Sequence, residues 1–188
     1  MKILNLFAGI GGNRTLWGNE HEITAIEYDQ KIAILYQKEF PNDEIIIGDA
    51  YEYFLKYFKD FDLIWASPPC QSHSRLVRTN ISQGQGIKYP DLRLYELIIF
   101  CQNFCKSFYI IENIIPYYKP LIRPTIKLGR HLIWTNIPIQ PLKIKKFDFS
   151  KCNGGTGSSP KYMKNRINPK IAKYILDSIN TKTLEDFI

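Results

Sequence analysis

Residues 61–71, FDLIWASPPCQ, combine an apolar run with a rigid turn and a cysteine. The run at 61–66 predicts a buried strand. Pro68 and Pro69 each fix φ and lack a backbone N–H, so they stiffen the turn in which this strand ends. We therefore expect Cys70 at the carboxyl end of a strand, where open α/β sheets carry their chemistry. A thiolate held there is a strong nucleophile; a structural turn with a buried thiol is the alternative for this stretch alone.

Apolar runs and helical periods alternate on both sides of this stretch. Strands are predicted at residues 2–7, 22–28, 44–47, 61–66, 109–111 and 131–137, and helices at 29–40, 51–58, 92–108 and 168–179, with a further helix beginning in 14–17. Strands that alternate with helices favour a doubly wound, mostly parallel sheet. We therefore predict an α/β fold with a Rossmann-like sheet, in a single domain of 188 residues.

The composition favours a globular protein with a polyanionic partner. The hydrophobic fraction is 45%, the net charge is +7 and the pI is about 9.1.

The cysteines match neither a zinc module nor a disulfide framework, so we predict no metal site. Cys101 and Cys105 lie one helical turn apart, and we expect them in the core. No stretch approaches the roughly 18 apolar residues of a membrane span, and the start lacks a signal-peptide pattern. A cytoplasmic protein is expected.

A glycine-rich turn and two strand-end carboxylates indicate a nucleoside-bearing ligand. Gly9 and Gly11 follow the first strand and let the backbone approach a ligand closely. Glu27 ends the second strand, where a carboxylate can accept both ribose hydroxyls. Arg14 breaks the dinucleotide glycine spacing, which counts against a pyrophosphate cofactor. Asp49 ends the third strand, where a ligand contact and a helix N-cap are both open.

Glu112 is the second candidate for the site of Cys70. It follows the apolar residues 109–111, a strand that should neighbour the one before Cys70. Partial burial would raise the pKa of this carboxyl and allow it to act as an acid at neutral pH. A helix cap is the open alternative for Glu112.

Six motifs occur in the order found in the cytosine carbon-5 DNA methyltransferases. They are FAGIGG, IEYD, GDA, SPPCQS, IIENI and a late strand with an arginine. The chain resembles this family over residues 3 to about 137, and KNRINPKIA in the region 165–175 is similar to its terminal cofactor-side motif. The resemblance implies the S-adenosylmethionine-dependent methyltransferase fold, S-adenosyl-L-methionine as cofactor and double-stranded DNA as partner.

The resemblance also implies roles for individual residues. Cys70 would add to carbon 6 of a cytosine that is flipped out of the duplex, while Glu112 would contact the ring nitrogen and the exocyclic amine. Arg130 would contact the base carbonyl. The implied cofactor contacts are Phe7, Gly9, Gly11, Glu27, Tyr28, Asp49, Pro69 and Asn165. The predicted substrate contacts are Ser72, Arg75 and Arg78 in the polar loop 71–90, and Lys145 and Lys146 in the basic stretch after the last strand.

The chain departs from the family pattern in its recognition region. Leu128, Gly129 and Arg130 offer one arginine where two are usual. Only residues 143–164 separate the last strand from the terminal motif, where the family commonly has a small domain. We expect a single catalytic domain over 1–188 with a minimal basic insert at about 141–164 that grips phosphates. RNA as the substrate, a partner subunit that supplies sequence recognition, and a non-catalytic nucleic-acid-binding subunit are the alternatives.

Overall fold

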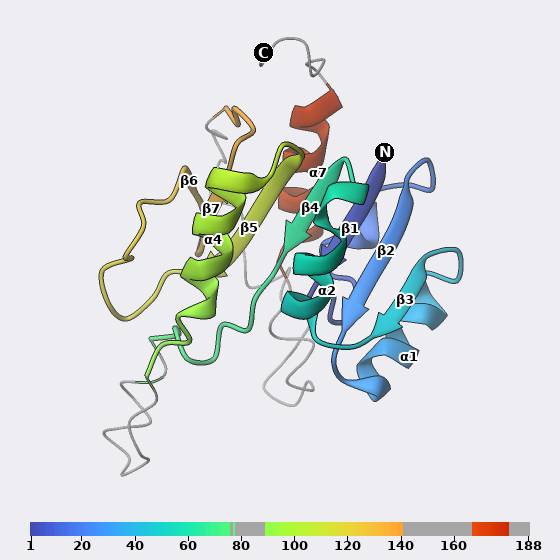
Figure 1. Ribbon diagram of the computed structural model, residues 1–188, viewed down its shortest axis with the longest axis horizontal. Helices are drawn as coiled ribbons and strands as arrows, with labels where there is room; N and C mark the ends of the chain where they lie inside the picture. Colours follow the sequence, from blue (N-terminus) through green and yellow to red (C-terminus); the bar gives the residue numbers. More distant parts are fainter. Residues whose placement is uncertain (76, 78–88, 141–166, 181–188) are drawn as a thin grey trace.

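The computed structural model describes residues 1–75, 77, 89–140 and 167–180 and shows a seven-stranded sheet with helices on both faces (Figure 1). The strands are β1 (Lys2–Leu6), β2 (Glu22–Glu27), β3 (Glu44–Ile47), β4 (Leu63–Ala66), β5 (Phe108–Ile114), β6 (Ile126–Leu128) and β7 (His131–Thr135). The helices are α1 (Gln30–Glu39), α2 (Ala50–Tyr57), α4 (Arg93–Phe104) and α7 (Pro169–Asn180), with the 3-10 helices η1 (Arg14–Leu16) and η2 (Phe58–Asp60). Within the described ranges, no helix combines the length and apolar character needed to cross a membrane.

The sheet has the strand order β3-β2-β1-β4-β5-β7-β6. The neighbours from β3 to β5 are parallel, whereas β7 lies antiparallel between β5 and β6. The chain order reverses between β1 and β4, and such a switch point opens a crevice at the carboxyl ends of the strands. The predicted doubly wound, mostly parallel α/β sheet is confirmed.

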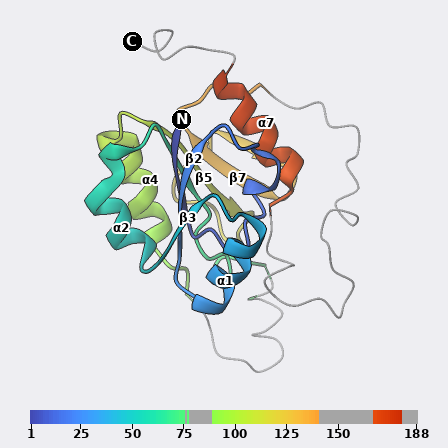
Figure 2. The same ribbon diagram turned by 90° about the vertical axis from the view of Figure 1, so that its right-hand side faces the viewer.

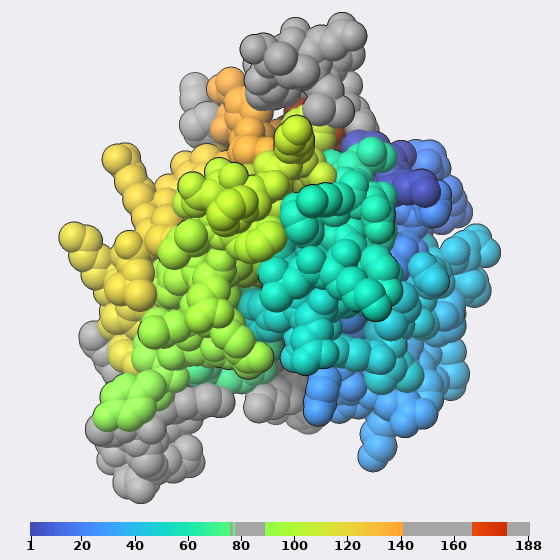
Figure 3. Space-filling model, viewed as in Figure 1, coloured from blue at the N-terminus to red at the C-terminus, as the bar shows by residue number. Residues whose placement is uncertain are grey.

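Two apolar layers join the sheet to its helices. α2 and α4 cover one face, and α1 and α7 cover the other (Figure 2). Alternate residues of a strand face opposite layers, so Ile64 packs in the α2 and α4 layer and Trp65 in the α7 layer. α2 and α4 lie side by side (Figure 3), with the rings of Phe54 and Phe100 5.1 Å apart between centroids. Burial on both faces explains why all of β4 is apolar.

β5 is longer at both ends than the predicted strand 109–111. Phe108 begins it, because its N–H donates to the Asp62 carbonyl at 3.0 Å, and α4 therefore ends earlier than predicted. Its second half extends beyond β4 because it pairs with β7, where Glu112 lies opposite Ile133. Glu112 is thus inside a strand, and the helix-cap alternative for this residue is wrong.

β6 forms where the sequence pattern predicts no strand. It pairs with β7 in a hairpin in which Leu128 lies opposite His131, so Gly129 and Arg130 make the turn. The Arg130 carbonyl accepts the N–H of Ile115 at 2.9 Å, which ties this turn to the end of β5. The hairpin therefore holds Arg130 beside the strand that carries Glu112.

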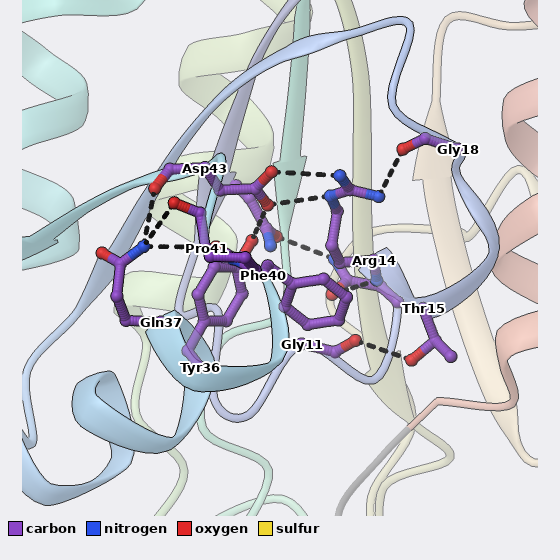
Figure 4. Close-up of polar contacts among 11 residues, drawn as sticks. Gly11, Arg14, Thr15, Gly18, Tyr36, Gln37, Phe40, Pro41 and Asp43 are labelled. Atoms are coloured by element: carbon purple, nitrogen blue, oxygen red, sulfur yellow. Dashed lines mark hydrogen bonds and ion pairs between the residues drawn. The ribbon is translucent and has the colours of Figure 1, made fainter.

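Arg14 is buried and makes tertiary contacts (Figure 4). The helix expected to begin in residues 14–17 is only the single turn η1. Its Nε and Nη2 atoms donate to the two carboxylate oxygens of Asp43 at 2.8 and 3.0 Å, and its Nη1 donates to the Gly18 carbonyl at 2.7 Å. The Tyr36 hydroxyl donates to the same carboxylate at 2.7 Å. The guanidinium carbon lies 5.1 Å from the centroid of the Phe40 ring. This cluster fixes the glycine-rich turn to α1.

Candidate active site

Two cavities lie at the carboxyl ends of the central strands. The first, of about 230 Å³, is bounded by the ends of β1 and β4 and by β5 and β7. The second, of about 360 Å³, lies over the ends of β1, β2 and β3. Phe7 and Glu27 line both, so the cavities adjoin. The first is also lined by Gly9, Gly12, Ser67, Pro68, Cys70, Glu112, His131 and Ile167, and the second by Tyr28, Asp49, Tyr51 and Arg93.

Backbone N–H groups hold the Glu27 carboxylate between the two cavities. Its Oε2 accepts the N–H of Gly9 at 2.8 Å, and its Oε1 accepts the N–H of Asp29 at 2.9 Å. Each carboxylate oxygen has a further lone pair with which it can accept a ligand hydroxyl. Gly9 has a φ of 57°, and a Cβ added there would meet no atom within 4 Å. The turn thus leaves open space beside a fixed carboxylate.

Phe7 adopts the left-handed backbone region, with a φ of 57°, which a non-glycine residue rarely occupies. Such a conformation costs about 1–3 kcal/mol and persists where the surrounding structure enforces it, often in a ligand site. The Phe7 ring packs edge-on against Tyr51, with centroids 5.0 Å apart. The strained residue therefore forms the wall that the two cavities share.

Gly11 serves packing and is not part of either described cavity wall. Gly12 lines the first cavity instead. Gly11 has a φ of 76°, and a Cβ added there would lie 2.1 Å from Cε2 of the Phe40 ring. The cofactor contact at Gly11 stays a prediction, while the structure shows that this glycine lets the turn pack against Phe40.

Gly11→Ala is expected to lower the free energy of unfolding by about 2–4 kcal/mol, because the added methyl group meets the Phe40 ring and φ is unfavourable. Gly9→Ala has the same kind of φ but open space around the methyl group, so about 1–2 kcal/mol is expected. Urea denaturation of both variants measures the difference. Equal losses would show that Phe40 does not restrict Gly11.

Tyr28 and Asp49 line the second cavity together with Glu27. Tyr28 is 79% exposed, so its ring offers an apolar surface there. Asp49 is also the N-cap of α2, since its Oδ1 accepts the N–H groups of Tyr51 and Glu52 at 2.8 and 3.1 Å. The two alternatives for Asp49 are therefore compatible: the residue caps the helix and bounds the cavity.

The turn that carries Cys70 is anchored on both sides. Before the cysteine, Nδ2 of Asn113 on β5 donates to the Pro68 carbonyl at 3.0 Å. After it, the Cys70 carbonyl accepts the N–H groups of His73 and Ser74 at 3.1 and 3.0 Å, so the chain coils immediately. Cys70 is half-buried and lines the first cavity, as expected for a cysteine presented at a strand end.

Pro68 rather than Pro69 lines the first cavity. Pro68 is buried, whereas Pro69 is exposed and belongs to neither cavity wall. The cofactor contact at Pro69 stays a prediction; of the two prolines, Pro68 is the one that lines the cavity.

Glu112 lies in the first cavity and is only 6% exposed. Burial raises the pKa of its carboxyl to about 7, against a hydrogen bond from Ser67 and the positive charge of Arg130, which both lower it. The Ser67 hydroxyl in turn accepts the indole N–H of Trp65 at 3.3 Å. Glu112 is therefore present in both protonation states near neutral pH, which suits a group that donates and accepts a proton.

His131 is a cavity residue that the sequence patterns do not single out. It begins β7, is 3% exposed and lines the first cavity. Its Nε2 lies 3.7 Å from Oε2 of Glu112. The available signal was a histidine at the start of a mostly apolar strand, directly after Arg130.

The other predicted residues are placed as follows. Ser72 is buried, and its hydroxyl accepts the N–H of Asp91 at 3.1 Å, so it joins the two ends of a loop. Arg75 is exposed, and Arg130 is half-buried outside the walls of both cavities, although its charge acts on Glu112. Arg78, Lys145, Lys146 and Asn165, with the basic insert at 141–164, lie outside the described residues.

The first cavity therefore places a soft nucleophile, Cys70, in the same space as a buried carboxyl that exchanges protons near neutral pH. Such a pair can add a thiolate to an unsaturated carbon while a neighbouring heteroatom is protonated. The adjoining second cavity offers a carboxylate and an aromatic ring, the groups that suit a ribose and a base.

Comparisons with known proteins point to one family. The C-5 cytosine-specific DNA methylase profile matches residues 1–114. The type II methyltransferase M.Bsp6I of Bacillus sp. (strain RFL6) is 34% identical over 84 residues, which are 39% of this chain and 24% of that protein. The matched part of the chain thus spans about a quarter of that relative.

Two solved structures are similar to part of this chain. A mutant of DNMT2 from Spodoptera frugiperda is 25% identical, with 60% of this chain and 35% of that chain covered and a TM-score of 0.42. A putative DNA modification methyltransferase encoded within prophage Cp of E. coli is 20% identical, with 63% and 33% covered and a TM-score of 0.41. The family profile, by contrast, covers more than half of the chain, from β1 to the end of β5, including Cys70 and Glu112. The chain therefore belongs to the C-5 cytosine-specific DNA methylase family.

Proposed function

We propose that this protein transfers the methyl group of S-adenosyl-L-methionine to carbon 5 of a cytosine in double-stranded DNA. The observation that carries the proposal is that Cys70 and the buried Glu112 line one cavity, which adjoins a second cavity through Glu27. Family membership, a net charge of +7 and an exposed Arg75 near the site support a polyanionic substrate.

The residues of the second cavity fit S-adenosyl-L-methionine. Glu27 is fixed by two backbone N–H groups and suits the two ribose hydroxyls, while Tyr28 and Asp49 suit the face and the edge of an adenine. The open space beside Gly9 lets a ligand lie close to the backbone between the cavities. When bound, this cofactor supplies an electrophilic methyl group.

Three side chains would act on the cytosine. The Cys70 thiolate forms a bond to carbon 6, while Glu112 gives a proton to ring nitrogen 3, so that carbon 5 becomes nucleophilic. After carbon 5 is methylated, its proton passes to solvent water, the electron pair of that C–H bond re-forms the ring double bond, and the bond to Cys70 breaks to release the thiolate. Glu112 takes its proton back from nitrogen 3. Arg130, whose charge already acts on Glu112, is positioned to contact the base carbonyl.

Glu27→Ala is expected to weaken cofactor binding by about 1–3 kcal/mol, because charge-assisted hydrogen bonds to the ribose are lost. Calorimetric titration with S-adenosyl-L-methionine measures the change. Glu22→Ala is the matched control, since Glu22 begins the same strand and is exposed far from the cavities. If both variants bind the cofactor as the wild type does, Glu27 has no role in holding it.

The identity of the nucleic acid is tested directly by radiolabel transfer to duplex DNA and to folded RNA. We expect DNA to be methylated, and bisulfite sequencing of DNA from cells that express the protein should show the modified cytosines. Transfer to RNA alone would contradict the DNA proposal.

The cytoplasmic location of the protein stays a prediction.

Sequence recognition is proposed to be short or relaxed, because the basic insert at 141–164 offers few side chains for base edges. Purified protein on a random-sequence DNA library separates this proposal from its alternative. Methylation that begins only when a second chain is added would favour a partner subunit that supplies recognition.

A further inference from the structure

His131 lies next to Glu112 on the same face of the sheet. In the β5–β7 ladder, Glu112 is opposite Ile133 and His131 is opposite Ile114, so Glu112 and His131 are diagonal neighbours. His131 is 3% exposed, and its Nε2 is 3.7 Å from Oε2 of Glu112. Both side chains line the first cavity. A buried imidazole therefore faces Glu112, the carboxyl group that transfers a proton in the proposed reaction.

This contact does not join two charges. Burial, and then the positive charge of Arg130, lower the pKa of His131 to about 4, so its ring is neutral at neutral pH. Nδ1 of the ring is buried and has no hydrogen-bond partner in the described part of the chain. A buried N–H without an acceptor is rarer than a buried acceptor without a donor. The ring proton is therefore assigned to Nε2, the nitrogen that faces Glu112.

Two other groups favour the charged form of the Glu112 carboxyl. Ser67 at the end of β4 donates a hydrogen bond, and Arg130 in the β6–β7 turn contributes its charge. Cys70 and Glu27 line the same cavity from the turn after β4 and from β2. Neither Ser67 nor Arg130 lies on β7. His131 lies on β7, and its Nε2 is the atom that approaches Oε2 of Glu112.

We propose that His131 is a positioning residue: its Nε2–H attracts Oε2 of Glu112 across 3.7 Å, so that the other carboxyl oxygen stays turned toward the base in the cavity. The role rests on the proposed function, in which Glu112 gives a proton to the ring nitrogen. A neutral donor suits this role, because it favours the carboxylate without the strong preference that a full positive charge would impose.

The proposal fixes the direction of a pKa change. An N–H that faces the carboxylate stabilises the charged form, so its removal in His131→Leu raises the pKa of Glu112 above about 7. His131→Gln keeps an N–H donor and should leave the pKa closer to the wild-type value. Because protonated Glu112 is the active form, the rate falls as pH rises through this pKa, and in His131→Leu the fall should move to higher pH.

Carbon-13 NMR of protein labelled at the glutamate carboxyls measures the pKa without any need for turnover. Glu112→Gln assigns the signal, and His21→Leu, at a buried histidine before β2, is the matched control. We expect a rise of about one pH unit in His131→Leu, a smaller change in His131→Gln and none in His21→Leu. An unchanged or lower pKa in His131→Leu overturns the proposal.

Nitrogen-15 NMR of the wild-type protein gives a test that survives if His131→Leu fails to fold. A neutral ring with its proton on Nε2 supports the proposal, and a proton on Nδ1 overturns it.

The pH profile of methyl transfer, measured beside the Glu112 pKa, separates the proposed function from the role of His131. If the Glu112 pKa rises in the variant but the wild type methylates no DNA, the proposed function fails while the contact stands. If DNA is methylated and the Glu112 pKa does not move, the role of His131 fails alone.

Discussion

Cys70→Ser is expected to abolish methyl transfer, with a loss on the order of 10⁴-fold or more, the scale seen when a covalent nucleophile is removed. A serine hydroxyl is not ionised at neutral pH and is a harder, weaker nucleophile than a thiolate. The turn that presents residue 70 is held by Pro68 and Asn113 through backbone and amide atoms, so the substitution leaves its anchoring intact. The loss would therefore report chemistry rather than folding.

A mechanism-based DNA substrate makes this test specific. DNA with 5-fluorocytosine cannot lose the substituent at carbon 5, so an enzyme that attacks carbon 6 stays bound to it covalently once the methyl group has moved. Denaturing electrophoresis should show the adduct for the wild type and for Cys105→Ser, but not for Cys70→Ser. Cys105 is a half-buried cysteine that lines neither of the two cavities. An adduct in Cys70→Ser would show that another residue is the nucleophile.

Much of the fold could be predicted because the sheet is buried on both faces. A strand that is buried on both faces is a near-continuous apolar run, and residues 63–66 show this without interruption. Pro68 and Pro69 made the turn before Cys70 predictable, since proline restricts the backbone whatever surrounds it. Features that follow from one short segment, such as the strand end and its cysteine, were therefore accessible from the sequence.

The rest depends on contacts between distant segments. β6 forms because β7 pairs with it, and a segment of three residues is too short for its hydrophobic pattern to predict a strand. Glu112 lies inside β5 because the same partner extends that strand. A side chain at Gly11 would meet the Phe40 ring, which comes from the end of α1. His131 gains its place beside Glu112 from strand register, which periodicity alone does not give.

Asp43→Asn is expected to lower the free energy of unfolding by about 3–5 kcal/mol, the cost of leaving one member of a buried ion pair without its partner. The side chains of Arg14 and Asp43 are only 5% and 3% exposed, so water cannot replace the lost charge. Asn is nearly isosteric with Asp, which limits the loss to electrostatics and to the hydrogen bond from Tyr36.

Urea denaturation of Asp43→Asn beside Asp177→Asn separates buried from exposed pairing. Asp177 pairs with Lys173 on α7, where the side chains are 47% and 40% exposed, so its loss should cost under about 1 kcal/mol. The double variant Arg14→Met with Asp43→Asn should be more stable than the sum of the two single losses predicts, because no unpaired buried charge remains. Additive losses would show that the two residues act independently. A coupled result would show that the buried charge pair helps to fix the glycine-rich turn beside Glu27, since Arg14 joins that turn to Asp43 and to the Gly18 carbonyl.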